Sequence, residues 1–571
     1  MGEPEVRVGK ETMNLLIGGE AGQGLLTIAQ ILTKTLVRSG YYIVVNQSYQ
    51  SRIRGGHNTF AIRVSNREII APQEKIDLLI ALDQDTVRIH LPEMTEDGRI
   101  VVDAKFDLSG ERFIKIPYNE LADQLHANIA ALGVIGSLLG LDAGVMIQAV
   151  DDYFGAKKPE VAQQNRQTMT DTEKWLATYN LPSSLKLTPI PNPPPRLMIN
   201  GNEALALGAL SAGVKFCAFY PMTPATSIPL TLIEAGKRMG LIVEQAEDEI
   251  AAVNMAIGAS YAGAPSMVAT SGGGFALMVE GVSLAAMTET PIFIVVGQRP
   301  GPATGLPTRT EQSDLEFVLH SGHGEFPRAI FAPGTVEECF HLARRALELA
   351  EASQGPVFLL TDQFMADSYR AVPPFELEGL SAVSAGSPAA EAPLPYRRYA
   401  LTASGKSPRL LPGMGPHLVV ADSDEHTEDG HLTEDLAVRV QMVDKRLRKL
   451  QDLLAAVVPP EYHGDENPEL LLVTWGSSRG SVLETAESLK AEGKRVAALC
   501  FSQVWPLAPA QFLNSLQGAG QVIAVEGNAT GQLARLIRRE TGFFIDQVIG
   551  RYDGLPVTPE FIRRELSRGA R

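Results

Sequence analysis

Short apolar runs alternate with stretches of helical periodicity along most of the chain. The first example is MNLLIGGEAGQGLLTIAQILTKTLVRSG, which reads as a strand, a glycine-rich turn and a helix, and the strand YYIVV follows directly. The runs KIDLLIALDQ and RIVVDA extend the same pattern. Strands that alternate with helices predict a mainly parallel α/β domain over residues 1–186.

The alternation returns in two further blocks. FCAFYP, LIVEQ, SMVATS, PIFIVVGQ and PVFLLTD predict strands of a domain at residues 197–371, and ELLLVTWGSS, RVAALCF and QVIAVEG predict strands of a domain at residues 467–571. Residues 187–196 hold five prolines and predict a stiff linker. Residues 372–466 are irregular apart from one predicted helix, RVQMVDKRLRKLQDLLAAV, and form a linking segment.

Composition narrows the class of protein. The chain has 571 residues and a formal charge of −16, which argues against binding to nucleic acid. Its three cysteines are far apart in sequence, which excludes a disulfide framework and a four-cysteine cluster within the chain. The N-terminus is charged and no apolar run is long enough to span a membrane. We therefore expect a cytoplasmic protein that does not enter a membrane.

The motif FYPMTPATS, residues 219–227, follows a predicted strand with a restricted backbone. Pro221 and Pro224 each force the preceding residue into an extended conformation. Thr223 is therefore held at the carboxyl end of a strand, where open α/β sheets bind ligands. A plain loop is the alternative.

The motif VVGQRPGPATGLPTRTEQSDL, residues 295–315, leaves another strand as a loop rich in glycine and proline. It carries Arg299 and Thr308. A planar guanidinium on a rigid loop suits a substrate that bears a carboxylate. A single arginine in a loop is otherwise a surface charge, but its place after a strand end favours function.

The segment EQAEDEIAAVNMAIGAS, residues 244–260, places acids directly before an apolar run. Acids in the first turn of a helix interact favourably with the helix dipole, which accounts for Glu247 and Asp248. Glu249 differs because, at helical spacing, it shares a face with apolar residues. A carboxyl on that face can share a proton with a ring nitrogen of a ligand. We therefore predict that Glu249 is a functional acid.

Two glycine motifs in the first block are candidates for anion binding. GGEAGQG lies between a strand and a helix, where backbone amides can bind an anion, but its spacing is not GxGxxG and a tight turn is the alternative. SYQSRIRGGHN places arginines beside a glycine pair, which suits either phosphate binding or a solvated face. From these motifs we choose Gly22, Arg54 and Gly55 as candidate binding residues.

Other catalytic and metal-binding patterns are missing. DSDEHTEDGHLTED, residues 422–435, has Thr427 where a calcium loop requires glycine, and we predict a solvated acidic turn. The sequence contains neither HExxH nor GxSxG, so nucleophilic hydrolysis has no support. No metal ligand is predicted in this chain.

The motifs together resemble a known family. YPMTPATS, EDEIAAVNMAIGASYAGA, TSGGGFALMVEG, QRPGPATGLPTRTEQSDL and GHGEFPR are similar to the alpha subunit of 2-oxoacid:ferredoxin oxidoreductases, above all the 2-oxoglutarate type. GGEAGQG and SYQSRIRGGHN resemble the gamma part of these enzymes, fused upstream, and VIAVEGNATGQLARLIRRETG resembles their transketolase C-terminal-like domain. The resemblance implies a multidomain α/β fold whose middle domain is a pyrimidine-type thiamine diphosphate-binding domain.

The resemblance also implies an activity. Members of the family use thiamine diphosphate to convert a 2-oxoacid and coenzyme A into acyl-CoA and carbon dioxide, and pass electrons through an iron–sulfur cluster to ferredoxin. The family's glutamate contacts the aminopyrimidine ring and stabilises its imino tautomer. The implied residues are Glu249 and Thr223 for the cofactor, Thr223, Arg299 and Thr308 for the oxoacid, and, as our own choice, Gly22, Arg54 and Gly55 for coenzyme A.

Part of the family's machinery is absent from the sequence. EDGR, EDGH and YDGL lack the glycine that precedes Asp in the magnesium motif of thiamine enzymes, and three cysteines cannot bind a [4Fe–4S] cluster. In the family a beta subunit carries Mg²⁺ and the cluster. The resemblance therefore implies activity only with that subunit, in a dimer of alpha–beta heterodimers. Two alternatives stay open: a pyruvate, branched-chain or aryl 2-oxoacid as substrate, and a non-catalytic structural subunit.

Overall fold

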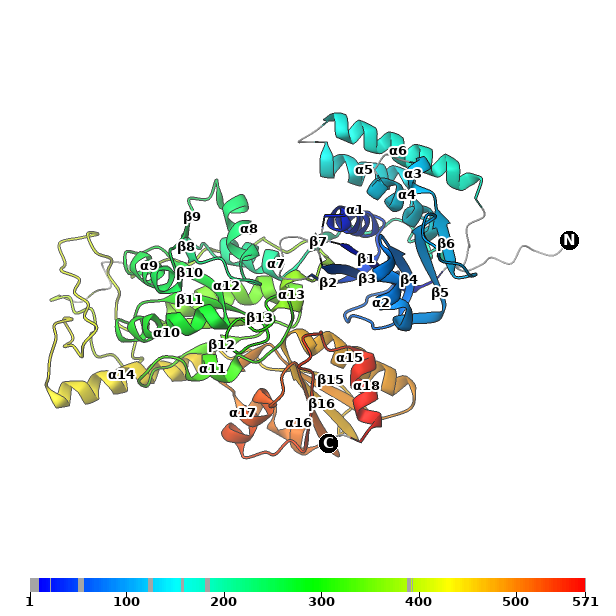
Figure 1. Cartoon of the computed structure of the whole chain (residues 1–571). Coiled ribbons are helices and arrows are strands. Elements are labelled where there is room, and N and C mark those ends of the chain that lie inside the picture. The colour runs from blue at the N-terminus through cyan, green and yellow to red at the C-terminus, as the bar shows by residue number, and fades with distance from the viewer. Residues whose placement is uncertain are drawn as a thin grey trace. The chain divides into compact units, whose positions relative to one another are not determined.

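The chain folds into two compact units in this computed structural model. Its described residues are 10–20, 22–49, 56–121, 127–155, 159–179, 185–387, 392 and 394–569. Contacts divide the chain into a first unit, Met1–Ile199 with Asp367–Phe375, and a second unit, Asn200–Ala366 with Glu376–Arg571 (Figure 1). Strands alternate with helices in both units, which confirms the predicted multidomain α/β class.

The sheet of the first unit is mixed, with strand order β6-β5-β4-β1-β3-β2-β14-β7. β1 pairs in parallel with β4 and antiparallel with β3, which is also antiparallel to β2. The sequence predicts a mainly parallel layer, and this prediction is wrong for the half of the sheet that contains β3 and β2. Polar and apolar residues alternate in β3, so this strand gives no apolar run. The strands are β1 (Thr12–Glu20), β2 (Tyr42–Ser48), β3 (His57–Ser65), β4 (Ile76–Ala81), β5 (Met94–Asp103), β6 (Phe113–Ile116), β7 (Leu197–Ile199) and β14 (Arg370–Val372).

Helices cover both faces of this sheet (Figure 1). α1 packs on β1, β2 and β3, and α4 and α5 pack against α1, which together enclose the larger apolar core. α2 packs near β4 and closes a smaller core. The helices are α1 (Leu25–Arg38), α2 (Gln84–His90), α3 (Tyr118–Leu121), α4 (Ala127–Leu139), α5 (Ala143–Phe154) and α6 (Pro159–Ala177).

The second unit contains a seven-stranded sheet with strand order β18-β12-β13-β11-β10-β8-β9. All neighbours are parallel except β12 and β18. The central strands are buried on both faces, which explains why they read as continuous apolar runs. The strands are β8 (Phe216–Phe219), β9 (Ile242–Gln245), β10 (Ser266–Ser271), β11 (Ile292–Gln298), β12 (Ala329–Phe331), β13 (Pro356–Asp362) and β18 (Gln503–Trp505).

A five-stranded sheet, β15-β17-β16-β19-β20, completes the second unit. One apolar core includes residues of both sheets of this unit, among them Val296, Phe358 and Trp475. The strands are β15 (Glu461–Gly464), β16 (Leu470–Trp475), β17 (Val496–Phe501), β19 (Gln521–Glu526) and β20 (Gln547–Gly550). The helices of the unit are α7 (Gly201–Ser211), α8 (Ser227–Gly236), α9 (Glu249–Tyr261), α10 (Gly272–Met287), α11 (Leu315–His320), α12 (Val336–Ser353), α13 (Gln363–Asp367), α14 (Leu436–Ala455), α15 (Arg479–Ala491), α16 (Leu513–Gln517), α17 (Gln532–Thr541) and α18 (Pro559–Ser567).

A buried ion cluster fastens α14 to the domain that holds the seven-stranded sheet. Glu289 is fully buried, and its carboxylate lies 2.6 Å from Nζ of Lys445 and 2.5 Å from Nζ of Lys449. Burial opposes the charge of Glu289, but both lysines and Arg398 outweigh it and hold its pKa well below the usual range. The linking segment is therefore anchored by paired charges as well as by apolar contacts.

Candidate active site

Three parallel neighbours bring the predicted loops to one edge of the seven-stranded sheet. β10 lies between β8 and β11, so the segments that follow the carboxyl ends of these strands emerge together. Thr223 follows β8 and Arg299 follows β11. Nη1 of Arg299 donates a hydrogen bond to the carbonyl oxygen of Thr223 at 2.7 Å. The fold thus joins two residues that were predicted from separate motifs.

Glu249 opens helix α9 and lies inside the fold. The helix begins here because the side chain of Asp248 accepts a hydrogen bond from the Ala251 amide at 2.7 Å and caps it. Glu249 is 3% exposed and lies on a buried face with Ala252, whereas Glu247 is exposed. Oε1 of Glu249 is buried and has no hydrogen-bond partner among the residues that the structure describes. A buried polar atom in this state is costly, and a ligand that donates a proton is the expected partner.

The glycines that begin α10 leave room for two carboxylates. A Cβ at Gly274 would lie 2.5 Å from Oε1 of Glu249, and a Cβ at Gly272 would lie 2.5 Å from Oδ2 of Asp314. Like Oε1 of Glu249, both Oδ2 of Asp314 and Oγ of Ser271 are buried without a hydrogen-bond partner in the described part of the chain. Three such atoms around one helix N-terminus indicate a polar ligand site.

Asp314 is a site residue that the motifs did not single out. It occupies the N-cap position of α11, yet its side chain does not cap that helix. Burial raises the pKa of Asp314 to about 6, the charge of Glu311 adds to the rise, and Arg299 opposes it. Burial also lowers the pKa of Arg299, and Asp314 counteracts this effect. The only sequence signal for Asp314 is an acid at a helix start in the same loop as Arg299.

The other predicted residues are placed less closely. Thr308 lies in the same loop as Arg299 and is largely buried. Gly22 belongs to the first unit and has a φ of +98°. No atom of the described residues lies within 4 Å of the position that a Cβ of Gly22 would take. Arg54 and Gly55 lie outside the described residues.

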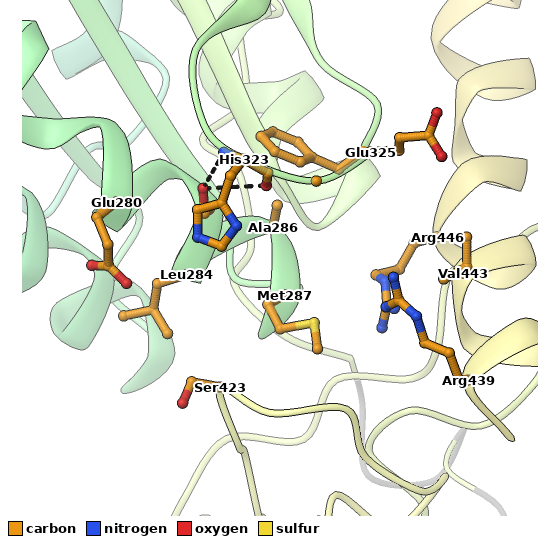
Figure 2. A pocket seen from close by; sticks show the side chains of 13 residues that line it. Glu280, Leu284, Ala286, Met287, His323, Glu325, Ser423, Arg439, Val443 and Arg446 are labelled. Carbon is orange, nitrogen blue, oxygen red and sulfur yellow. Dashed lines mark hydrogen bonds between the residues drawn. The ribbon is translucent and has the colours of Figure 1, made fainter. Parts of the chain in front are cut away.

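A separate cavity of about 380 Å³ lies between α10, the loop after α11, and α14 (Figure 2). Oγ of Ser283 accepts a hydrogen bond from the His323 amide at 2.9 Å and fixes that loop. Arg439 and Arg446, which also line the cavity, are ion-paired with Glu425. None of Thr223, Glu249, Arg299 and Thr308 lines this cavity. It is therefore distinct from the edge where the predicted loops meet.

The acidic segment 422–435 is partly buried. Glu425 accepts hydrogen bonds from Arg446 at 2.8 and 3.0 Å, and its side chain is 12% exposed. His426 is fully buried, with Nδ1 3.0 Å from the carbonyl oxygen of Asp424. The prediction of a solvated turn is wrong for Glu425 and His426. The Glu425 carboxylate is largely buried because it pairs with Arg446 on α14. Among the described residues, no group of three or more His, Cys, Asp or Glu is arranged to hold a metal ion.

Two family models match the chain. The model described as pyruvate flavodoxin/ferredoxin oxidoreductase, thiamine diphosphate-binding, matches residues 207–445, and the model described as pyruvate ferredoxin/flavodoxin oxidoreductase matches residues 14–173. A thiamine diphosphate-binding domain is therefore present, and it contains Thr223, Glu249, Arg299 and Thr308. Within the part of the chain that the structure describes, no helix has the length and hydrophobicity needed to cross a membrane.

Known proteins match along almost the whole chain. The alpha subunit of a 2-oxoacid:ferredoxin oxidoreductase from Sulfolobus sp is 33% identical over 97% of this chain and 96% of that subunit. The 2-oxoglutarate oxidoreductase subunit KorA of Mycobacterium tuberculosis is 27% identical over 92% of this chain and 87% of that subunit. The solved 2-oxoglutarate:ferredoxin oxidoreductase of Magnetococcus marinus, with 2-oxoglutarate, coenzyme A and succinyl-CoA bound, matches with a TM-score of 0.92 and 29% identity over 98% of this chain and 99% of that chain. The predicted resemblance is confirmed, and the chain belongs to the alpha subunits of the 2-oxoacid:ferredoxin oxidoreductases.

Proposed function

We propose that this chain is the alpha subunit, with a fused gamma domain, of a 2-oxoglutarate:ferredoxin oxidoreductase. The reaction converts 2-oxoglutarate, coenzyme A and two oxidised ferredoxins into succinyl-CoA, carbon dioxide, one proton and two reduced ferredoxins, and it is reversible. The observation that carries the proposal is the buried, unpartnered carboxylate oxygen of Glu249 at the sheet edge that also holds Arg299. The relatives named for 2-oxoglutarate support the choice of substrate.

The surroundings of Glu249 fit thiamine diphosphate. A carboxylate with a buried, unpartnered oxygen suits a protonated ring nitrogen of the aminopyrimidine, because a charge-assisted hydrogen bond satisfies both groups. Gly274 keeps the space beside that oxygen free of a side chain. When bound, thiamine diphosphate supplies the electron sink for decarboxylation. Glu249 holds the proton at the ring nitrogen, and Thr223 at the same edge provides a further polar contact.

Arg299 and Thr308 are proposed to bind the oxoacid. Nη1 of Arg299 is held by the carbonyl oxygen of Thr223. A guanidinium has five N–H donors, so the remaining donors are able to bind a carboxylate in a fork geometry. Partial burial keeps water from competing with this ion pair. Thr223 and Thr308 add hydroxyl groups for the keto and carboxylate oxygens.

A beta subunit is proposed to complete the site. This chain lacks the magnesium motif and the cysteines for a [4Fe–4S] cluster, which are therefore assigned to the partner. Helices α9 and α10 expose Ile250, Met255 and Leu277, which are 50%, 43% and 50% exposed and suit a face that a partner covers. Ferredoxin takes the electrons, and the assembly is a dimer of alpha–beta heterodimers. The fused gamma domain, with Gly22, Arg54 and Gly55, is assigned to coenzyme A.

Purification with the natural partner chain tests this proposal. The complex should reduce a viologen dye when it receives 2-oxoglutarate and coenzyme A together, and much more slowly with pyruvate, a branched-chain or an aryl 2-oxoacid. Faster turnover of another oxoacid would reject the substrate and keep the enzyme class. A complex that contains the cluster but turns over no oxoacid would favour a structural subunit.

A further inference from the structure

Gln312 connects the loop that carries Arg299 to a different part of the second unit. We name residues 299–314 the substrate loop and residues 467–571 the C-terminal segment. The side chain of Gln312 is 2% exposed. Its Nε2 donates to the carbonyl oxygen of Trp475 at 2.9 Å, and its Oε1 accepts from the Gly527 amide at 2.7 Å. Oε1 also accepts from Oγ of Ser478 at 3.1 Å, so donor and acceptor are both engaged.

The backbone of Gln312 makes the same connection. Its amide donates to the carbonyl oxygen of Gly527 at 2.6 Å, and its carbonyl oxygen accepts from Nδ2 of Asn528 at 3.1 Å. Gly527 and Asn528 follow the carboxyl end of β19, and Trp475 is the last residue of β16, the parallel neighbour of β19. The ends of two strands in the C-terminal segment therefore hold one residue of the substrate loop. Five hydrogen bonds to one segment far exceed the average of about one intramolecular hydrogen bond per residue in folded proteins.

The residues that hold Gln312 are themselves fixed. Glu526 is fully buried and accepts hydrogen bonds from Nε1 of Trp475 at 3.0 Å and from Nδ2 of Asn528 at 2.9 Å. It also accepts from the Leu533 and Ala534 amides, each at 3.0 Å, at the start of α17. A carboxylate with four donors is fully satisfied and rigid. Glu526 therefore holds Trp475 and Asn528, two of the residues that bind Gln312.

Residues on both sides of Gln312 are attached as well. The Thr310 amide donates to the carbonyl oxygen of Gly554 at 3.2 Å, and Nε2 of Gln532 donates to the carbonyl oxygen of Ser313 at 2.7 Å. A Cβ at Gly527 would lie 2.9 Å from Oε1 of Gln312, so glycine leaves the space that the glutamine fills. The end of the substrate loop is thus a tightly fitted attachment.

We propose that Gln312 is a positioning residue for oxoacid binding. By attaching the substrate loop to the C-terminal segment, it holds Thr308 and Arg299 in the arrangement that receives the substrate carboxylate. The residues between Arg299 and Asp314 form neither helix nor strand, so without an attachment their backbone entropy opposes binding. The inference rests on the function proposed for Arg299 and Thr308. In this proposal the C-terminal segment orders the oxoacid site, although none of the predicted site residues belongs to that segment.

The Gln312→Ala variant, tested in the complex with the partner chain, should raise the KM for the oxoacid. If the loop then occupies its binding arrangement about 1–10% of the time, the KM rises about 10- to 100-fold. We expect kcat to change less than about threefold, and the constants for coenzyme A and thiamine diphosphate to stay within about twofold. Hydrogen exchange of residues 300–311 should become faster in the same variant, which is a readout that needs no activity.

Gln503→Ala is the matched control. Gln503 is 2% exposed, accepts from the Val458 amide at 2.9 Å and donates to the carbonyl oxygen of Trp505 at 3.1 Å, so its truncation also removes buried hydrogen bonds. It should lower the melting temperature without changing the KM or the exchange of the loop. Equal KM values for Gln312→Ala and the wild type would overturn the inference, as would an equal KM rise in the control.

A milder variant covers the case in which Gln312→Ala does not fold. Ser478→Ala removes one of the hydrogen bonds to Oε1 and should raise the KM about two- to fivefold, with faster exchange in the loop. An unchanged KM together with unchanged exchange would contradict the inference. If the wild-type complex prefers another oxoacid, the proposed substrate is wrong and the same comparison is made with that oxoacid. If it turns over none, the exchange data alone decide whether Gln312 orders the loop.

Discussion

The substitution Glu249→Gln distinguishes the effect of the Glu249 carboxylate on the stability of the chain from its effect on cofactor binding. The variant keeps the size of the side chain but removes its charge. In the wild type, Oε1 of Glu249 is buried without a partner from the described residues, and Glu249 is 3% exposed. An unsatisfied buried polar atom costs about 1–3 kcal/mol, so the carboxylate does not stabilise the chain alone. We therefore expect the free energy of unfolding of the chain alone to stay the same or to rise by about 1 kcal/mol.

The same substitution should weaken the binding of thiamine diphosphate, although it does not destabilise the chain. A hydrogen bond to a charged group contributes about 1.5–3 kcal/mol, which corresponds to about a 10- to 150-fold weaker affinity for thiamine diphosphate when the charge is removed. Turnover should fall at least as much, because the proton at the ring nitrogen is no longer held by a carboxylate. Calorimetric titration of the complex with thiamine diphosphate and Mg²⁺ measures the affinity, and urea denaturation of the chain measures stability.

Glu247→Gln is the control for this experiment, because Glu247 lies two residues away, carries the same charge and is exposed. It should leave both the affinity and the free energy of unfolding within experimental error. If Glu249→Gln binds thiamine diphosphate as tightly as the wild type, the Glu249 carboxylate does not contact the cofactor, contrary to our proposal. The proposal is also contradicted if the variant loses several kcal/mol of stability, since the carboxylate would then have a structural partner.

Three further substitutions test other parts of the account. Asp314→Asn should remove a pH dependence: the folded pKa of about 6 is above the unfolded value of 3.8, so stability is lost as pH rises through this window, and the variant should gain up to ~3 kcal/mol in urea denaturation at pH 7 but little below pH 4. In kinetic assays the KM of the wild type for 2-oxoglutarate should rise as the pH rises above 6, because Asp314 then gains a negative charge near Arg299. The KM of Asp314→Asn should not rise in this range. Gly274→Ala should weaken thiamine diphosphate binding at least tenfold in calorimetry, because its Cβ would lie 2.1 Å from Oγ1 of Thr270 and 2.5 Å from Oε1 of Glu249 and would displace both; an unchanged affinity would show that cofactor binding does not need the present position of Oε1. Glu289→Ala should destabilise the chain by ~3–5 kcal/mol in urea denaturation, because it leaves two buried lysines without a counter-ion; a loss below 1 kcal/mol would show that the ion cluster is dispensable.

The sequence predicts the elements of this fold wherever one simple pattern dominates. Strands buried on both faces, such as β10 and β11, appear as continuous apolar runs. β3 does not, because polar and apolar residues alternate along it. The burial of Glu249 is predictable because a helix repeats every 3.6 residues, so its face follows from its neighbours.

The remaining parts depend on contacts between distant segments. Gln312 and Asp314 stand in the same motif as Arg299, but nothing local shows that one is held by the C-terminal segment and the other faces Gly272. Likewise, the charged sequence of α14 does not show that Lys445 is fully buried, with Glu289 as its ion-pair partner. Local patterns predict burial well only when the residue is apolar or sits on an apolar face.

The activity of the complex should depend on thiamine diphosphate bound next to Glu249. The complex of this chain with its partner is stripped of the cofactor, and dye reduction by 2-oxoglutarate and coenzyme A is measured before and after the cofactor and Mg²⁺ are returned. We predict that activity disappears on removal and returns on addition in the wild type, and that Glu249→Gln needs about 10- to 150-fold more cofactor. Undiminished activity without thiamine diphosphate, or full activity of this chain without its partner, would contradict the account.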